Sequence, residues 1–81
     1  MGKFVVTFEG LLMDPHMTKL GLADDVEYRS SSTLAARAAG VGSKLHTVIA
    51  EAESQTAATE AVARALGADA GKFHNWRVEQ V

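Results

Sequence analysis

The chain begins with a run of alternating apolar and mixed positions. Residues 3–9 place Phe4, Val6 and Phe8 on one side of an extended backbone and Val5, Thr7 and Glu9 on the other. A period of two, filled with aromatic and β-branched residues, predicts a β-strand. We expect the strongly apolar side of this strand to face the core.

The second half of the chain predicts a strand, a helix and a further strand. The strands cover 45–53 and 75–79, and Ser54 offers a cap for a helix over 55–66. Small and apolar residues recur with helical spacing along it, at Ala58, Ala61, Val62, Ala65 and Leu66. We expect 69–71 to form a loop. Because a helix separates the two strands, they can run parallel to each other.

The segment 11–25 is less regular. Asp14 and Pro15 are typical of a helix start, and a helix of one or two turns would end near Gly21. Met17 and Leu20 would then share one side of that helix.

Residues 26–39 fit two patterns. As a strand they alternate between two sides, and the glycines at 40 and 42 would turn the chain into the next strand. As a helix, Leu34 to Ala39 would follow a Thr33 cap and end at Gly40. We favour the strand because its period covers more of the segment, and the helix stays open as the alternative.

Together these elements predict an α+β fold in a single domain over 1–81. We expect a four-stranded, mainly antiparallel sheet with one main helix on one face, in the order β-β-β-α-β. Such an arrangement is ferredoxin-like or related. A short extra helix near 15–21 would complete it.

Composition narrows the function classes. The chain has 81 residues, no cysteine and a formal net charge of −2. Alanine makes up much of its apolar content, so a core of this size stabilises by only about 3–5 kcal/mol, and a homodimer would bury more. The charge and the lack of a Lys/Arg run make nucleic acid an improbable partner. No signal-peptide pattern or membrane-length apolar run is seen, so the cytoplasm is the expected compartment.

Three histidines are the residues best suited to a metal site or a general base. His16, His46 and His74 lie far apart in the sequence, whereas zinc sites usually contain a close pair of ligands. The glycines before Lys44 are not in the order of a phosphate-binding loop. We therefore expect no metal and no cofactor, with His46 and His74 on the core-facing side of their strands.

The outward side of the predicted sheet is apolar without being aromatic. It carries Val5, Leu45 and Ile49, and no ring on which a nucleobase could stack. Apolar patches of this kind mark partner or self-association surfaces. The alternative is that the 11–25 segment folds over the patch.

Met13, Met17 and Leu20 form a second candidate contact for a partner, because methionine adapts to irregular surfaces. The alternative is that these side chains plug one end of the core.

The runs Val48–Ser54, Ala57–Leu66 and Trp76–Val81 resemble small α+β proteins of unassigned function that are frequent in actinobacteria and their phages. The resemblance covers about the second half of the chain. It implies a small accessory or host-interacting protein and assigns no functional residue.

The function predicted on these grounds is a non-enzymatic module that binds another protein. The first alternative is a small dimeric ferredoxin-like enzyme with a pocket near His46, His74 and Trp76. The second alternative is nucleic-acid binding.

Overall fold

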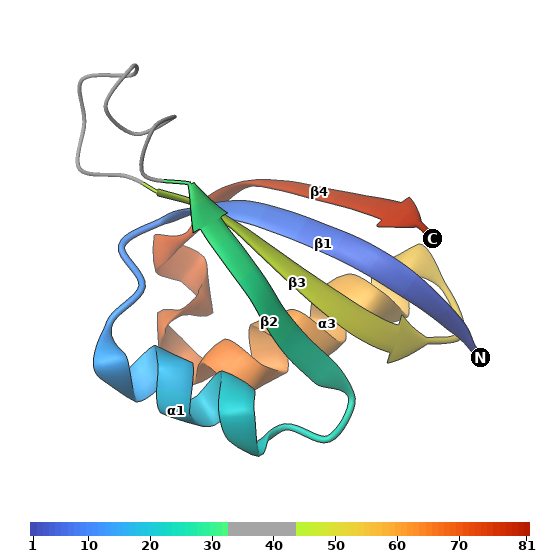
Figure 1. Ribbon diagram of the computed structural model, residues 1–81, viewed down its shortest axis with the longest axis horizontal. Helices are drawn as coiled ribbons and strands as arrows, with labels where there is room; N and C mark the ends of the chain where they lie inside the picture. The colour runs from blue at the N-terminus through green and yellow to red at the C-terminus, as the bar shows by residue number, and fades with distance from the viewer. Residues whose placement is uncertain (33–43) are drawn as a thin grey trace.

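A computed structural model describes residues 1–32 and 44–81 of the chain (Figure 1). Its elements, in chain order, are β1 (Gly2–Gly10), α1 (Asp14–Leu22), β2 (Val26–Ser32), β3 (Lys44–Ala52), α3 (Gln55–Leu66), the 3₁₀ helix η1 (Gly67–Lys72) and β4 (His74–Gln80). The predicted alternation along 33–39 and the turn at 40–42 lie outside the described residues.

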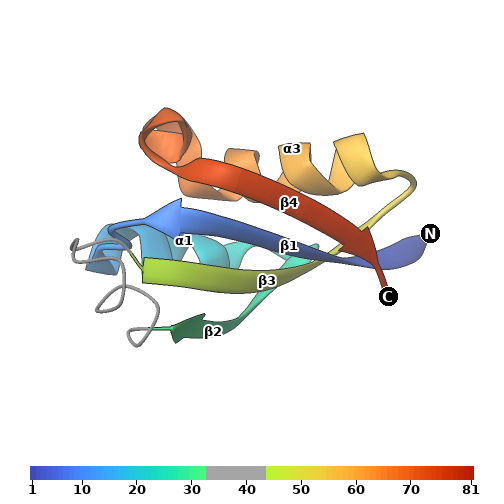
Figure 2. The ribbon, with the colours of Figure 1, turned by 90° about the horizontal axis from the view of Figure 1, so that it is seen from above.

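The described strands form one antiparallel sheet in the order β2-β3-β1-β4 (Figure 2). β1 pairs with β3 on one side and with β4 on the other, and β2 pairs with β3. Since β3 and β4 are each antiparallel to β1, they run parallel to each other with β1 between them. Their predicted parallel direction is confirmed.

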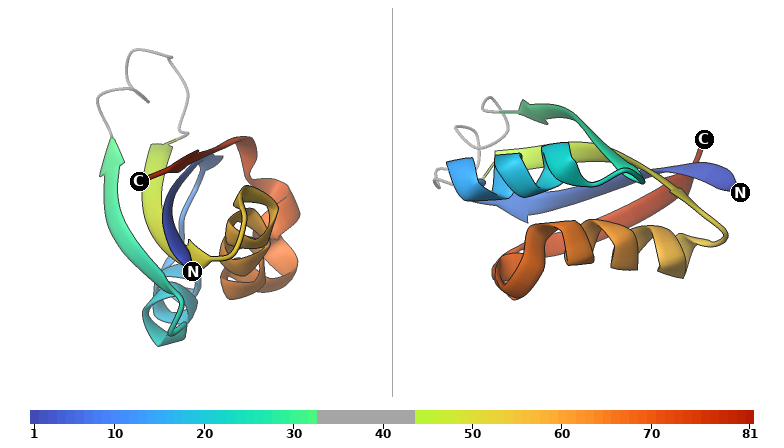
Figure 3. Two further views of the ribbon diagram at one scale, coloured as in Figure 1. Left: turned by 90° about the vertical axis from the view of Figure 1, so that its right-hand side faces the viewer. Right: turned by 90° about the horizontal axis from the view of Figure 1, so that it is seen from below.

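Both helices lie on the same face of the sheet (Figure 3). Among the described residues, the strands and α-helices follow in the order strand, helix, strand, strand, helix, strand. The predicted α+β class and the four antiparallel strands are confirmed. The β-β-β-α-β order is corrected, because the expected short extra helix is a nine-residue α1 that packs against α3 and β2.

The core fills the space between the sheet and the helices. Phe4, Val6 and Phe8 of β1 are all at most 4% exposed, as their alternation predicts. α3 faces them with Ala58, Ala61, Val62 and Leu66. The alanines let the helix approach the strands closely, so a short chain still encloses a packed core.

The start of α3 agrees with its sequence signals. Ser54 is the N-cap, and its side chain accepts a hydrogen bond from the Ala57 amide at 3.1 Å. Gly67 follows the last turn with a φ of 77°. The loop predicted at 69–71 is wrong, because η1 continues the chain as a 3₁₀ turn whose Ala70 carbonyl accepts from the Phe73 amide.

α1 buries a different side from the one expected. Leu20 is 1% exposed and His16 is 6% exposed, whereas Met17 is 38% exposed. Positions four apart share a helix face, so His16 takes the place beside Leu20 that the prediction gave to Met17. The helix also ends at Leu22 rather than at Gly21.

Candidate functional site

The side of the sheet opposite the two helices is covered by no described element (Figure 3). We call this surface the open face. Its outward side chains are Lys3, Val5, Thr7 and Glu9 of β1, Glu27 and Arg29 of β2, Leu45, Thr47, Ile49 and Glu51 of β3, and Asn75, Arg77 and Glu79 of β4. The predicted outward positions of Val5, Leu45 and Ile49 are thus confirmed.

The open face has an apolar centre. Val5 lies directly opposite Ile49, and Thr7 lies opposite Thr47, on the two central strands. Leu45 is 36% exposed at one end of this centre. The alternative in which the 11–25 segment folds over it is wrong, because α1 packs beside α3 on the other face.

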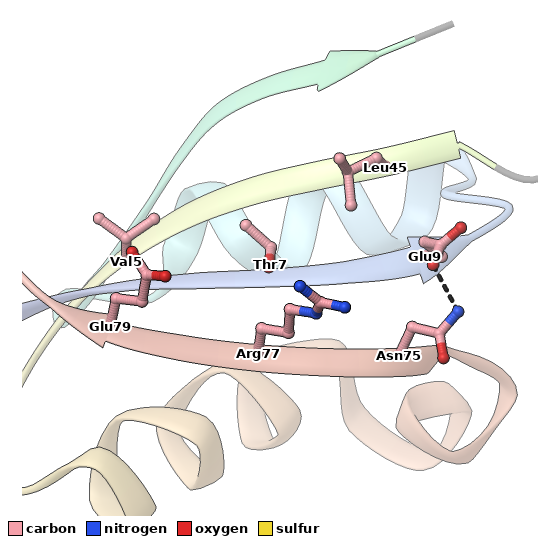
Figure 4. A pocket seen from close by; sticks show the side chains of 7 residues that line it. All are labelled: Val5, Thr7, Glu9, Leu45, Asn75, Arg77 and Glu79. Atoms are coloured by element: carbon pink, nitrogen blue, oxygen red, sulfur yellow. Dashed lines mark hydrogen bonds between the residues drawn. The ribbon is translucent and has the colours of Figure 1, made fainter. Parts of the chain in front are cut away.

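A shallow depression of about 500 Å³ lies over β1 and β4 on the open face (Figure 4). It is lined by Val5, Thr7, Glu9, Leu45, Asn75, Arg77 and Glu79. Aliphatic side chains therefore meet one guanidinium and two carboxylates in a small area. The depression is open to solvent along the sheet, whereas ligand sites usually bury most of the ligand's surface.

A β-bulge shapes one end of the depression. Thr7 pairs with Arg77, but Glu9 pairs with His74, so β4 holds one residue more than β1 over this stretch. Asn75 adopts a φ of 55° there, a left-handed conformation that asparagine tolerates better than most residues. Its side-chain amide donates to the Glu9 carboxylate at 2.5 Å.

Because of this bulge, the predicted core-facing position of His74 is wrong. Strict alternation with Trp76 would turn His74 toward the core, but it is exposed and lies opposite Glu9, an open-face residue. The extra residue interrupts the alternation of β4, so His74 faces the opposite side of the sheet from the one predicted.

The charged side chains of β4 are not paired within the described residues. Arg77 and Glu79 are exposed, and neither forms an ion pair with another described residue. By contrast, Glu27 and Arg29 of β2 pair with each other at 3.0 Å. The β4 side of the open face therefore has unused capacity for charge pairing.

His46 lies in the core, as its strand position predicts, with an exposure of 1%. Its Nε2 donates to the Gly10 carbonyl at 2.9 Å, and its Nδ1 lies 3.3 Å from the Tyr28 hydroxyl. Both ring nitrogens are engaged, and His46 is not placed to act as a general base.

The pocket expected near His46, His74 and Trp76 is filled by aromatic rings. Phe8 stacks on Trp76 at a centroid distance of 4.7 Å and contacts His46 at 5.5 Å on its other side. Phe73 closes the group with an edge contact to Phe8 at 5.2 Å. Together with the exposed His74, this arrangement gives no shared cavity for a substrate.

His16 makes a tertiary contact that the sequence did not predict. Its Nδ1 accepts the Met13 amide at 3.0 Å, so the proton of the neutral ring sits on Nε2, which donates to Asp69 Oδ2 at 2.8 Å. That hydrogen bond lowers the pKa of Asp69 below its ordinary value, and the hydrogen bond and positive charge of Lys72 lower it further. The cluster ties α1 to η1 and offers no free nitrogen for catalysis.

The second predicted contact surface is divided by the fold. Met13 is 50% exposed and Met17 is 38% exposed, whereas Leu20 belongs to the core. The alternative prediction, that these side chains plug one end of the core, therefore holds for Leu20, which is buried under α1. The two methionines remain on the surface, on the helix side of the molecule and away from Val5, Leu45 and Ile49.

Among residues 1–32 and 44–81, no three His, Asp or Glu side chains are grouped in a way that could hold a metal ion. In the same residues, no helix is both long enough and apolar enough to cross a membrane. No model of a known protein family matches the chain, and neither a characterised protein nor a solved structure is significantly similar to it.

Proposed function

We propose that this protein is a small, non-enzymatic accessory module that binds another protein through the open face of its sheet. The observation that carries the proposal is the apolar centre of Val5, Leu45 and Ile49, which no described element covers. The engaged nitrogens of His46 and His16 also favour binding over catalysis.

The open face has the composition of a protein interface. Aliphatic and threonine side chains occupy the middle of its two central strands. Charged side chains lie at the ends of these strands and on the two edge strands. Protein interfaces combine a depleted-charge centre with a polar rim in the same way. A nucleic-acid platform would instead need aromatic rings or a basic excess on this face.

We propose in addition that the fold is ferredoxin-like. Two successive strand-helix-strand units with the sheet order β2-β3-β1-β4 support a ferredoxin-like arrangement, which leaves one sheet face free for contacts. The resemblance of the second half to small actinobacterial and phage proteins supports an accessory role, with a host protein as the partner.

Capture of a partner from cell extract tests the proposal. The tagged wild-type chain should retain a specific protein that Ile49→Asp fails to retain, because a charge in the apolar centre would be buried unpaired. Thr56→Asp is the matched control, since Thr56 is exposed on α3 and on the other side of the sheet. Equal capture by the wild type and by Ile49→Asp would contradict a binding role for the open face.

A further inference from the structure

Cross-strand pairing arranges the open face in rows. The outward pairs of β1 and β3 are, in order along the strands, Lys3 with Glu51, Val5 with Ile49, Thr7 with Thr47, and Glu9 with Leu45. β4 adds Glu79 to the Val5 row and Arg77 to the Thr7 row. The two β4 charges are thus in neighbouring rows and have opposite signs.

Apart from Glu51, which meets Leu45, the outward residues of β1, β3 and β4 are complementary to those of a second copy about one particular two-fold axis. An axis that crosses the strands between the Val5 and Thr7 rows exchanges those two rows when it turns the face over. It places Arg77 of one copy opposite Glu79 of the other, twice over. It also places Lys3 opposite Glu9, and the aliphatic Val5 and Ile49 over the methyl groups of Thr7 and Thr47.

A two-fold axis along the strands has the opposite effect. It would set β4 over β2, which places Glu79 opposite Glu27, because both share the Val5–Ile49 row. Arg77 would then face the position of Ser30, next to Arg29 at the β2 bulge. Like charges facing each other across an interface are strongly unfavourable, so this orientation is disfavoured.

The size of the face suits a weak, reversible dimer. Four strands at about 4.8 Å spacing and about 3.3 Å per residue give a footprint of about 20 by 25 Å, or about 500 Å². Two such footprints bury about 1,000 Å², the lower end for a specific interface. A chain of 81 residues also has a small core of its own, so covering the open face adds to its stability.

We infer that a second copy of this chain occupies the open face, sheet against sheet, about the axis that crosses the strands between Val5 and Thr7. The inference rests on the proposed function insofar as both use the same surface. When no other protein is present, the rows and charges of the open face fit a second copy of the same chain. Any other protein that binds the open face then competes with the second copy.

Sedimentation of the purified chain over a wide concentration range, combined with charge exchange on β4, tests this inference. We expect a monomer–dimer equilibrium whose dissociation constant rises about tenfold or more for Arg77→Glu and for Glu79→Arg, since each change creates two like-charge contacts. The double variant R77E/E79R should restore the wild-type value, because the two pairs re-form with exchanged signs. Arg64→Glu, on the exposed side of α3, is the control and should leave the equilibrium unchanged.

Each other outcome overturns the inference. A monomer at every concentration excludes the second copy, and a dimer that ignores Arg77→Glu excludes this face. A double variant no better than the single ones excludes this axis. If the chain is a monomer yet still captures another protein through Ile49, the dimer is excluded and the proposed function stands. If the double variant restores the dimer but no other protein is captured, the dimer stands and the proposed function is excluded.

Discussion

The imidazole of His16 and the carboxylate of Asp69 lie 2.8 Å apart, although 53 positions separate them in the chain. The ring also accepts the Met13 amide and packs edge-on against Phe73 at 5.5 Å. A side chain three residues after an N-cap can satisfy the cap's own amide in this way. His16 therefore fixes the start of α1 and holds it against the segment before β4.

We expect His16→Ala to destabilise the protein by about 2–4 kcal/mol, because it leaves a cavity beside Phe73 and an unpaired amide at Met13. Urea unfolding followed by circular dichroism measures the change. Met17→Ala, one position along and largely exposed, is the control and should change the free energy of unfolding much less. Equal effects of the two substitutions would mean that the contacts of His16 add little to the fold.

Asp69 should make the free energy of unfolding depend on pH in the acidic range. The hydrogen bond from His16, and then the hydrogen bond and positive charge of Lys72, hold the folded-state pKa of Asp69 below its unfolded value. The stabilisation is therefore complete above the unfolded pKa and is lost as the pH falls through the folded one. We expect Asp69→Asn to be less stable than the wild type at neutral pH and the difference to shrink under strongly acidic conditions.

Urea midpoints measured from neutral pH down to about pH 2 would show this convergence. Glu60→Gln controls for the removal of one surface carboxylate, since Glu60 is exposed on α3. A difference between Asp69→Asn and the wild type that stays constant with pH would contradict the expected linkage.

Local patterns were enough to predict most elements. The alternation around Val6 gave β1, and Ser54 with the small residues of its helix gave α3. These signals are local because pleat and helix periods depend only on neighbouring residues. The open-face positions Val5, Leu45 and Ile49 followed from the same alternation.

The errors lie where distant residues decide the structure. His16 is buried because Asp69 and Phe73 come together around it, and no local pattern places those residues beside α1. His74 is exposed because β4 pairs with β1 through a bulge, which depends on a register set 65 residues earlier in the chain, at Glu9. The depression on the open face, which includes both Glu9 and Asn75, could not be predicted for the same reason.

The bulge at Asn75 gives a direct test of backbone conformation. With a φ of 55°, Asn75→Ala should destabilise the protein by about 1–2 kcal/mol, since a β-carbon disfavours the left-handed region. Asn75→Gly keeps that conformation accessible and loses only the hydrogen bond to Glu9, so it should be the milder change. Thermal unfolding of both variants measures the order. Both lose the side-chain hydrogen bond to Glu9, so a larger loss for glycine than for alanine would contradict the expected effect of the left-handed backbone at this position.

The close approach of α3 to the sheet depends on its smallest side chains. Ala58 is fully buried at 0% exposure on the side of α3 that faces the strands. Ala58→Leu adds three carbon atoms with no space to receive them, so we expect a loss of about 1–3 kcal/mol in the free energy of unfolding. Glu60→Leu, exposed on the same helix, is the matched control and should stay within about 0.5 kcal/mol of the wild type. Urea unfolding compares the two, and an unchanged or higher stability of Ala58→Leu would mean that the helix can move away from the sheet without loss.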